Sequence, residues 1–211
     1  MVHWSKALAA AGIAALFIGC ANYASLQDAD VVEKGKGSFG VGISYTTYQF
    51  EFSILDSTYK KDYTTPALNV WYRKGITDRF EVHTNLWFPM GLTIGVKYQL
   101  VGSLQKPGFG LALGLDGGYL QMSGDSSTVT LVDIYVPLYT GYKFSEGFGV
   151  YLIPKYIPRI VSGDELKVAN IVAGTGGIRL GKDTRFMAEF TYGYDATYKS
   201  PVLTTAMGVS F

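Results

Sequence analysis

Residues 201–211, at the end of the chain, alternate strictly between two kinds of side chain. One face at period 2 is mostly bulky and apolar and consists of Leu203, Thr205, Met207, Val209 and Phe211. The opposite face carries small or hydroxylated residues. Such alternation is typical of a β-strand with two different environments on its faces.

The same period recurs from residue 38 onward and predicts ten strands. They are expected at 38–52, 65–75, 79–88, 92–101, 109–122, 128–144, 148–161, 167–181, 184–195 and 201–211. Pro137, Pro154 and Pro158 count against the sixth and seventh strands, because proline cannot donate to a ladder. The stretch 53–63 is polar and is expected to be a long loop. An even number of strands joined in sequence predicts an all-β, ten-stranded antiparallel up-and-down barrel with both termini on one side.

Aromatic residues lie at both ends of the apolar face. One row is Phe39, Phe80, Phe109, Phe144, Phe148, Phe186 and Phe211, and the other is Phe88, Tyr119, Tyr156, Tyr192 and Tyr194. Two aromatic rows that flank an aliphatic band match the interfacial girdles of transmembrane barrels. The prediction is therefore a barrel whose apolar face contacts lipid.

A final strand that stops on the outward-facing Phe211 resembles the C-terminal assembly signal of Gram-negative outer-membrane β-barrels. Segments such as 73–82 and 91–101 look like strands of those families, whose members are mostly uncharacterised. The resemblance implies an outer-membrane location, contact with outer-membrane lipid, recognition by the outer-membrane assembly machinery, and a monomer. It carries no catalytic motif.

A soluble, lipid-anchored, lipocalin-like barrel is the alternative, because period 2 alone does not say which face points inward. Such a carrier would hold its apolar face inside and expose the other face to water. That other face is rich in Gly, Ala, Ser and Thr with scattered charges, which is a poor water-facing surface.

The N-terminal region is typical of a targeting segment. Lys6 precedes an apolar run at 7–19, which is too short to span a bilayer as a helix and fits a signal peptide. The next residue is Cys20, and residues 17–20 resemble a bacterial lipobox, which implies lipidation at Cys20. The alternative is ordinary signal-peptide cleavage near Ala21 or Ala24, with Cys20 an incidental small apolar residue. We expect residues 1–19 to be a lipoprotein-type signal peptide, 20–37 a periplasmic tether and 38–211 the barrel.

Charged residues on the polar face are candidates for a network inside the barrel. The basic ones are Arg73, Lys97, Lys143, Lys155, Arg159, Arg179 and Arg185, and the acidic ones are Glu81, Asp116, Asp133, Glu189 and Asp195. Buried charges must pair or stay hydrated, and ten strands leave little interior space. The lumen is expected to be a salt-bridged plug or a very narrow wet path.

Strand register predicts one row of this network. A turn centred on Thr77 sets Arg73 opposite Glu81, and a connection centred on Pro89 sets Glu81 opposite Lys97. One carboxylate would then lie between two cations across three strands. Directly opposed charges of this kind help to set the register.

Candidate chemistry is sparse. After removal of the signal peptide the remaining histidine is His83, which we interpret as a hydrogen-bonded lumen residue because no Ser nucleophile or Asp-x-His pair accompanies it. No Cys/His cluster suggests a metal, and no cofactor is expected. The net charge of +1 does not favour nucleic acid as a partner. The expected function is a membrane scaffold or a narrow, porin-like channel for an unknown small solute, with an outer-rim enzyme acting on lipid or peptide as a more distant alternative.

Overall fold

The computed structural model describes residues 23–54, 57–88, 91–102, 106–123, 128–162, 166–197 and 199–211. Among these residues no helix combines the length and the apolar character needed to cross a membrane. The expected signal peptide at 1–19 and the candidate lipidation site Cys20 lie outside the described residues.

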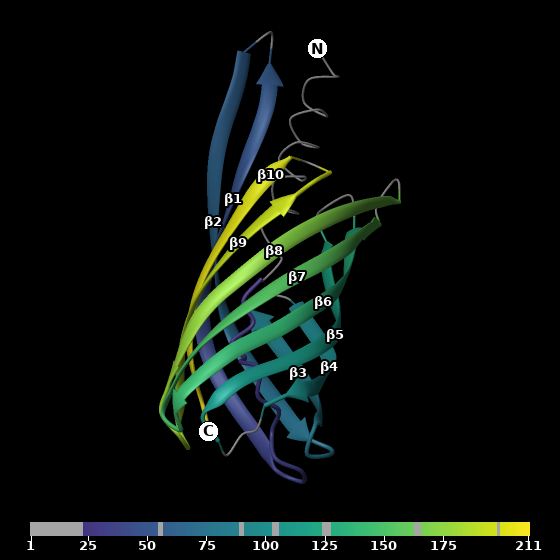
Figure 1. The fold of residues 1–211 in the computed structure, drawn as a ribbon. Helices are drawn as coiled ribbons and strands as arrows, with labels where there is room; N and C mark the ends of the chain where they lie inside the picture. The colour runs from purple at the N-terminus through teal and green to yellow at the C-terminus, as the bar shows by residue number, and fades with distance from the viewer. Residues whose placement is uncertain are drawn as a thin grey trace.

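The described residues form ten antiparallel strands that close into a barrel (Figure 1). The strands are β1 (Gly37–Ile54), β2 (Ser57–Gly75), β3 (Phe80–Phe88), β4 (Gly91–Val101), β5 (Gly108–Ser123), β6 (Thr128–Ser145), β7 (Phe148–Ser162), β8 (Lys167–Leu180), β9 (Arg185–Asp195) and β10 (Ser200–Ser210). Each strand pairs with its neighbours in sequence, and β1 closes the barrel against β10, with Gly40 opposite Ser210. The prediction of a ten-stranded up-and-down barrel is confirmed.

We name the two ends of the barrel by the connections that each one holds. The turn end holds the start of β1, the C-terminus and the connections after β2, β4, β6 and β8. The loop end holds the connections after β1, β3, β5, β7 and β9. Phe211 lies at the turn end, where its backbone exchanges hydrogen bonds of 2.8 and 3.1 Å with Phe39.

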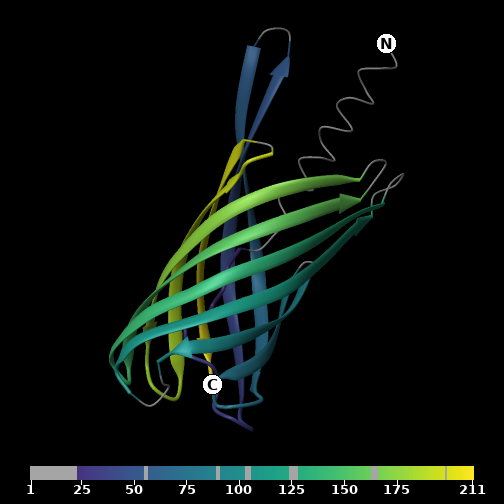
Figure 2. The ribbon, with the colours of Figure 1, turned by 45° about the vertical axis from the view of Figure 1, so that its right-hand side comes forward.

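The prediction of a loop at 53–63 is wrong. β2 begins at Ser57, and β1 and β2 pair residue by residue from Gly37 opposite Lys74 to Ile54 opposite Ser57. The β1–β10 pairing ends at Tyr48 and the β2–β3 pairing begins at Leu68, so the far part of this hairpin projects beyond the other strands (Figures 1 and 2). The β2 part of this projection, residues 57–63, is largely polar, as expected for a strand that extends past the barrel and needs no apolar face toward lipid.

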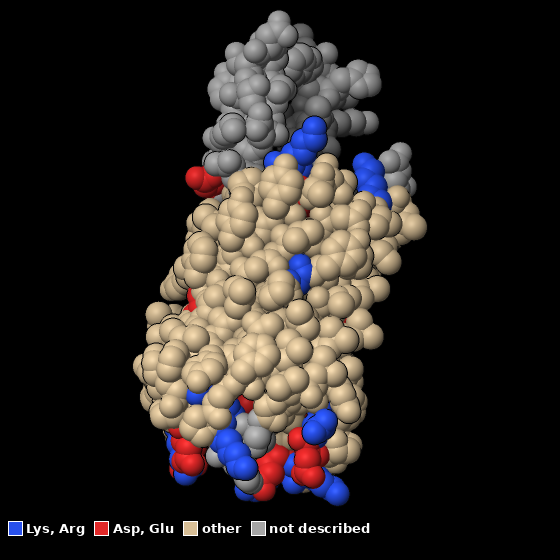
Figure 3. All heavy atoms as spheres, viewed as in Figure 1, with Lys and Arg blue, Asp and Glu red and all other residues tan. Residues whose placement is uncertain are grey.

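The apolar face points outward. Large apolar side chains from strands all around the barrel are exposed, for example Ile94 and Met207 at 60% and Phe211 at 62%. Both predicted aromatic rows lie on this surface, with Phe80 partly buried and the others exposed. Figure 3 shows a broad middle zone of the surface with few charged residues. Most of the charged residues in this view lie toward the ends of the barrel. The lipocalin-like alternative is therefore wrong, since its apolar face would lie inside.

The lumen is filled by the chain that precedes β1. We call residues 23–36 the luminal segment; it enters beside the loop-end halves of the strands and runs through the barrel to the turn end (Figure 1). Tyr23 and residues 26–32 are buried, whereas residues 33–37 are exposed. The expectation of a periplasmic tether is thus wrong for residues 23–32. A polar barrel interior supplies the hydrogen-bond partners that an extended peptide needs, so this segment is stable there without secondary structure of its own.

Candidate functional site in the barrel lumen

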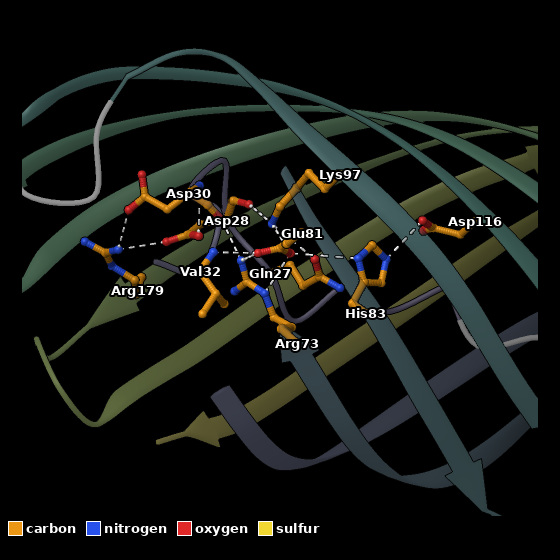
Figure 4. Close-up of polar contacts among 10 residues, drawn as sticks. All are labelled: Gln27, Asp28, Asp30, Val32, Arg73, Glu81, His83, Lys97, Asp116 and Arg179. Carbon is orange, nitrogen blue, oxygen red and sulfur yellow. Dashed lines mark hydrogen bonds and ion pairs between the residues drawn. The ribbon is translucent and has the colours of Figure 1, made fainter. Parts of the chain in front are cut away.

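Glu81 on β3 lies between two cations of the neighbouring strands (Figure 4). Arg73 on β2 donates from Nε and Nη2 to the two oxygens of Glu81, each at 2.9 Å, and Lys97 Nζ on β4 is 3.1 Å from Glu81 Oε1. Glu81 and Lys97 are fully buried. The predicted row of one carboxylate between two cations is present.

The register that produces this row differs from the prediction on one side. Glu81 pairs with Lys97 as expected, but Arg73 pairs with His83, and Glu81 stands opposite Gly75. The turn between β2 and β3 is therefore centred one residue later than Thr77. The ion pair still forms because the long arginine side chain reaches its diagonal neighbour.

The same charged groups bind the backbone of the luminal segment. The Val32 amide donates to Glu81 Oε2 at 2.7 Å, and Arg73 Nη2 donates to the Asp30 carbonyl at 2.5 Å. Lys97 Nζ donates to the Asp28 carbonyl at 3.1 Å and to Gln27 Oε1 at 3.2 Å. The row therefore holds the segment as well as the strands.

A second carboxylate holds the segment from the opposite wall. Glu189 on β9 accepts the amides of Ser25 and Leu26 at 2.5 and 3.0 Å, and it also accepts the Tyr151 hydroxyl at 3.1 Å. Because an unpaired backbone amide in a buried position costs free energy, these contacts make an extended conformation of the segment possible inside the barrel.

Two carboxylates of the segment bind cations of the wall. Arg179 Nη1 on β8 donates to Asp28 Oδ2 at 2.8 Å and to Asp30 Oδ2 at 3.0 Å. Lys143 on β6 lies 3.0 Å from Asp30 Oδ1. Asp28 Oδ1 also accepts the amide of Asp30 at 3.1 Å, which fixes the local turn of the chain.

Toward the loop end the segment ends against aromatic and apolar side chains. These form one buried cluster consisting of Tyr23, Tyr48, Tyr135, Ile157, Ile171, Ala173 and Val202. Lys155 Nζ donates to the Tyr23 carbonyl at 2.5 Å, and the Arg159 guanidinium lies 5.9 Å from the Tyr23 ring centroid. Arg159 itself forms a two-point ion pair with Asp133 at 2.7 and 2.8 Å.

His83 has the surroundings of a structural residue. Its Nε2 is 3.0 Å from Asp116 Oδ1 on β5, and its Nδ1 is 3.8 Å from Glu81 Oε1. Gly95 lies between these groups, and a Cβ there would come within 2.0 Å of the Asp116 carboxylate. The site links β3 to β5 across β4.

Cavities beside the segment are small. One, lined by Tyr23, His83, Asp116 and Lys155 among others, measures ≈ 30 Å³, and another, beside Asp28, Asp30 and Arg179, measures ≈ 20 Å³. Volumes of this size hold one or a few water molecules. Within the described residues, no group of three or more His, Cys, Asp or Glu side chains is placed to hold a metal ion.

Most of the predicted lumen residues lie where they were expected. Arg73, Glu81, His83, Lys97, Asp133, Lys143, Lys155, Arg159, Arg179, Glu189 and Asp195 are buried, and Asp116 is half-buried. Arg185 is at the edge of this group, because it lies at the turn end and its Nε donates to the Lys182 carbonyl at 3.2 Å.

The partners that the luminal segment supplies were not predicted from the sequence. Asp28 and Asp30 were assigned to a tether, although a signal for them existed. The basic candidates on the strands exceed the acidic ones by two, and the segment brings two carboxylates into the lumen. An unbalanced set of buried charges points to missing counter-charges elsewhere in the chain.

An exposed ion pair at the turn end provides a contrast with the lumen. Lys182 Nζ lies 2.5 Å from Glu146 Oε2, and both side chains are more than half exposed. The hydrogen bond and the charge of Lys182 lower the pKa of the Glu146 carboxyl. Exposed pairs of this kind contribute little to stability.

No family model matches this chain, and no curated protein matches it either. Among solved structures, the transport unit of the autotransporter AIDA-I from Escherichia coli is 11% identical, with a TM-score of 0.51, and the match covers 82% of this chain and 90% of that one. The translocator domain of NalP from Neisseria meningitidis is 9% identical, with a TM-score of 0.42 and coverage of 84% and 89%. Ail of Yersinia pestis is 14% identical, with a TM-score of 0.39 and coverage of 83% and 99%. Identities this low speak for the fold alone, and that fold is the β-barrel of Gram-negative outer-membrane proteins.

Proposed function

We propose that this protein is an outer-membrane lipoprotein whose barrel serves as a membrane scaffold and is closed to solutes by its own luminal segment. The observation that carries the proposal is the binding of that segment by charged side chains from most of the strands. The contributing side chains are Arg73, Glu81, Lys97, Lys143, Lys155, Arg179 and Glu189. A barrel that conducts at rest would leave such groups facing water rather than the backbone of its own chain.

The combined contacts of the segment support closure. Its amides at Ser25, Leu26 and Val32 and its carbonyls at Tyr23, Asp28 and Asp30 all have partners on the wall. The neighbouring cavities hold only water-sized volumes. Expelling the segment would separate several buried ion pairs at once. Each separation costs free energy, because the partner that stays on the wall is left as an uncompensated charge.

Conductance in planar bilayers tests this proposal. The wild-type protein is expected to show no steady conductance. A variant in which residues 23–32 are replaced by a Gly/Ser linker of equal length keeps the chain length but loses the luminal contacts, and it is expected to conduct. Equal, steady conductance from both proteins would contradict the closed scaffold.

Lipidation at Cys20 belongs to the same proposal. It is supported by the position of the chain's single cysteine directly after a short apolar run. Cys20→Ser is expected to abolish incorporation of labelled palmitate and to leave an unprocessed or differently cleaved precursor. Unchanged incorporation in that variant would rule out the anchor.

A gated, anion-preferring channel is the second candidate function. The candidate charged residues on the strands include two more basic than acidic side chains. If the luminal segment left the barrel, Asp28 and Asp30 would go with it, and this basic excess would line the lumen. If the linker variant conducts with a preference for chloride over potassium, release of the segment would produce an anion pathway. A cation preference or no preference would exclude this candidate.

A non-enzymatic role is part of the proposal as well. His83 is buried in the lumen and bonded to Asp116, at a distance from both rims. A general base needs a reacting group within hydrogen-bond reach, and the small cavity beside His83 has room for water alone. His83→Gln is therefore expected to alter stability without affecting any lipid or peptide hydrolysis by membranes that contain the protein.

A further inference from the structure

The luminal segment crosses the barrel from one end to the other. At its C-terminal side, Gly35 donates its amide to the carbonyl of Gly75, the last residue of β2 at the turn end, at 2.9 Å. At its N-terminal side, the Tyr23 ring packs against Tyr48 with a centroid distance of 6.4 Å. Tyr48 pairs with Val202, close to the loop-end start of β10.

The rise per residue along β1 and β10 gives the distance of Tyr23 from each end of the barrel. From Gly37 to Tyr48, β1 rises by eleven residues, which is about 36 Å along the strand. From the level of Tyr48 and Val202 to Ser200, at the loop-end start of β10, only two more residues remain, or about 7 Å. Tyr23 therefore lies close to the loop end and far from the turn end.

Chain length then decides where the preceding residues leave the barrel. Cys20 is three residues before Tyr23, so its Cα lies at most about 11 Å from that of Tyr23. This reach is enough for the loop-end rim beside β10, but it covers less than half of the distance to the turn end, even when the tilt of the strands is allowed for. In outer-membrane barrels the periplasmic side carries short turns and the outer side carries the longer extensions. The β1–β2 hairpin continues past the β1–β10 ladder to Ile54 at the loop end, so we assign the loop end to the outside.

We infer that the chain before Tyr23 emerges on the outside of the cell, so that the mature N-terminus and the C-terminus lie on opposite sides of the outer membrane. An even number of strands predicts both termini on one side, because it returns the chain to its starting end. The luminal segment adds one more crossing. An acyl chain on Cys20, which rests on the lipidation proposed above, is then placed at the outer leaflet rather than at the periplasmic one.

An epitope tag tests this topology in intact cells carrying the full-length protein. One tag is inserted between Asn22 and Tyr23, a second before Leu166, which is 71% exposed at the loop end, and a third after Lys182 in the exposed turn. We expect antibody to bind the first and second tags on intact cells and the third only after permeabilisation. A first tag that behaves like the third would overturn the inference.

A single-residue probe removes the risk that an inserted tag displaces the segment. In Asn22→Cys, a membrane-impermeant maleimide is applied to intact cells and the modified residue is identified by mass spectrometry, with Leu166→Cys and Lys182→Cys as the outer and inner references. Labelling of Asn22→Cys to at least half the extent of Leu166→Cys is expected. Labelling at the level of Lys182→Cys would again overturn the topology.

Failure of the lipidation proposal is distinguishable from failure of this inference. A Cys20 that remains in the mature chain without an acyl group would itself be labelled from outside in the wild-type protein and would carry no palmitate. That result would remove the acyl anchor and support the topology. The opposite result is palmitate on Cys20 with both N-terminal probes, the tag and Asn22→Cys, inaccessible from outside like the Lys182 references. That result would support lipidation and contradict the topology.

Discussion

Two levels of the lumen hold the luminal segment by different means. Around Asp28–Val32 the contacts are ion pairs and hydrogen bonds to Arg73, Glu81, Lys97, Lys143 and Arg179. Around Tyr23 they are mainly aromatic and aliphatic contacts with Tyr48, Tyr135, Ile157, Ile171 and Val202. Removing one member of the charged level leaves its partners uncompensated, whereas removing a methyl group from the apolar level costs only the lost packing. We therefore expect closure of the barrel to depend on the charged level and to be insensitive to small changes in the apolar level.

Glu81→Ala is expected to have the largest effect. It leaves Arg73 and Lys97 close together without their shared carboxylate, and it leaves the Val32 amide without its acceptor. The expected loss is about 3–5 kcal/mol of unfolding free energy. Thermal unfolding in detergent, followed by the gel shift between folded and heated samples, should occur at a lower temperature, and bilayers should show a new anion-preferring conductance.

Glu146→Ala is the matched control, because it removes one partner of an exposed ion pair. Its unfolding temperature and conductance are expected to equal those of the wild type. A Glu81→Ala protein that is indistinguishable from this control would show that the charged level does not close the barrel.

Asp28→Asn tests the contribution of the segment to the same level. The Arg179 guanidinium would lose a carboxylate at 2.8 Å, while the size of the side chain is unchanged. A hydrogen bond to a charged group contributes about 1.5–3 kcal/mol, and we expect a destabilisation in that range. Asp183→Asn, at an exposed turn position, is the control. If the two variants unfold alike, the Arg179–Asp28 contact contributes nothing measurable.

Gly75→Ala displaces the segment without changing any charge. A Cβ at this position would lie 2.3 Å from the carbonyl oxygens of Val32 and Glu33, so the backbone of the segment must move. Overpacking of this kind typically costs about 1–3 kcal/mol. The expected result is a raised open probability in bilayers. Gly147→Ala, where a Cβ would meet no atom within 4 Å, should behave like the wild type.

Ile157→Val is expected to have the smallest effect. The fully buried Ile157 packs in the apolar level, and loss of one methylene there costs about 0.5–1.5 kcal/mol. Closure should persist, with no new conductance. The control is Ile178→Val on the exposed outer face. A conductance as large as that of Glu81→Ala would erase the distinction between the two levels.

Of the two strand registers predicted from the sequence, that of β3 and β4 was correct and that of β2 and β3 was wrong by one residue in its centre. The connection centred on Pro89 was assigned correctly, and Glu81 pairs with Lys97. The turn after β2 was centred one residue too early, because its residues 76–79 carry no glycine pair or other signal that specifies the loop length. The predicted Arg73–Glu81 contact survived this error because a diagonal pair is still within reach of an arginine.

The sequence by itself determined the number of strands and the face of each that is apolar, because a period of 2 is a local property of the chain. It did not show that β1 and β2 continue through most of residues 53–63. It also identified the charged residues of the wall, such as Arg73, Glu81 and Lys97, since they occupy the polar face. Only the tertiary structure decided that residues 23–32 occupy the lumen. That segment has no period, and its partners come from strands as distant in sequence as β3 and β9. Its position therefore depends on a cavity and a set of hydrogen-bonding groups that exist only once the barrel has closed.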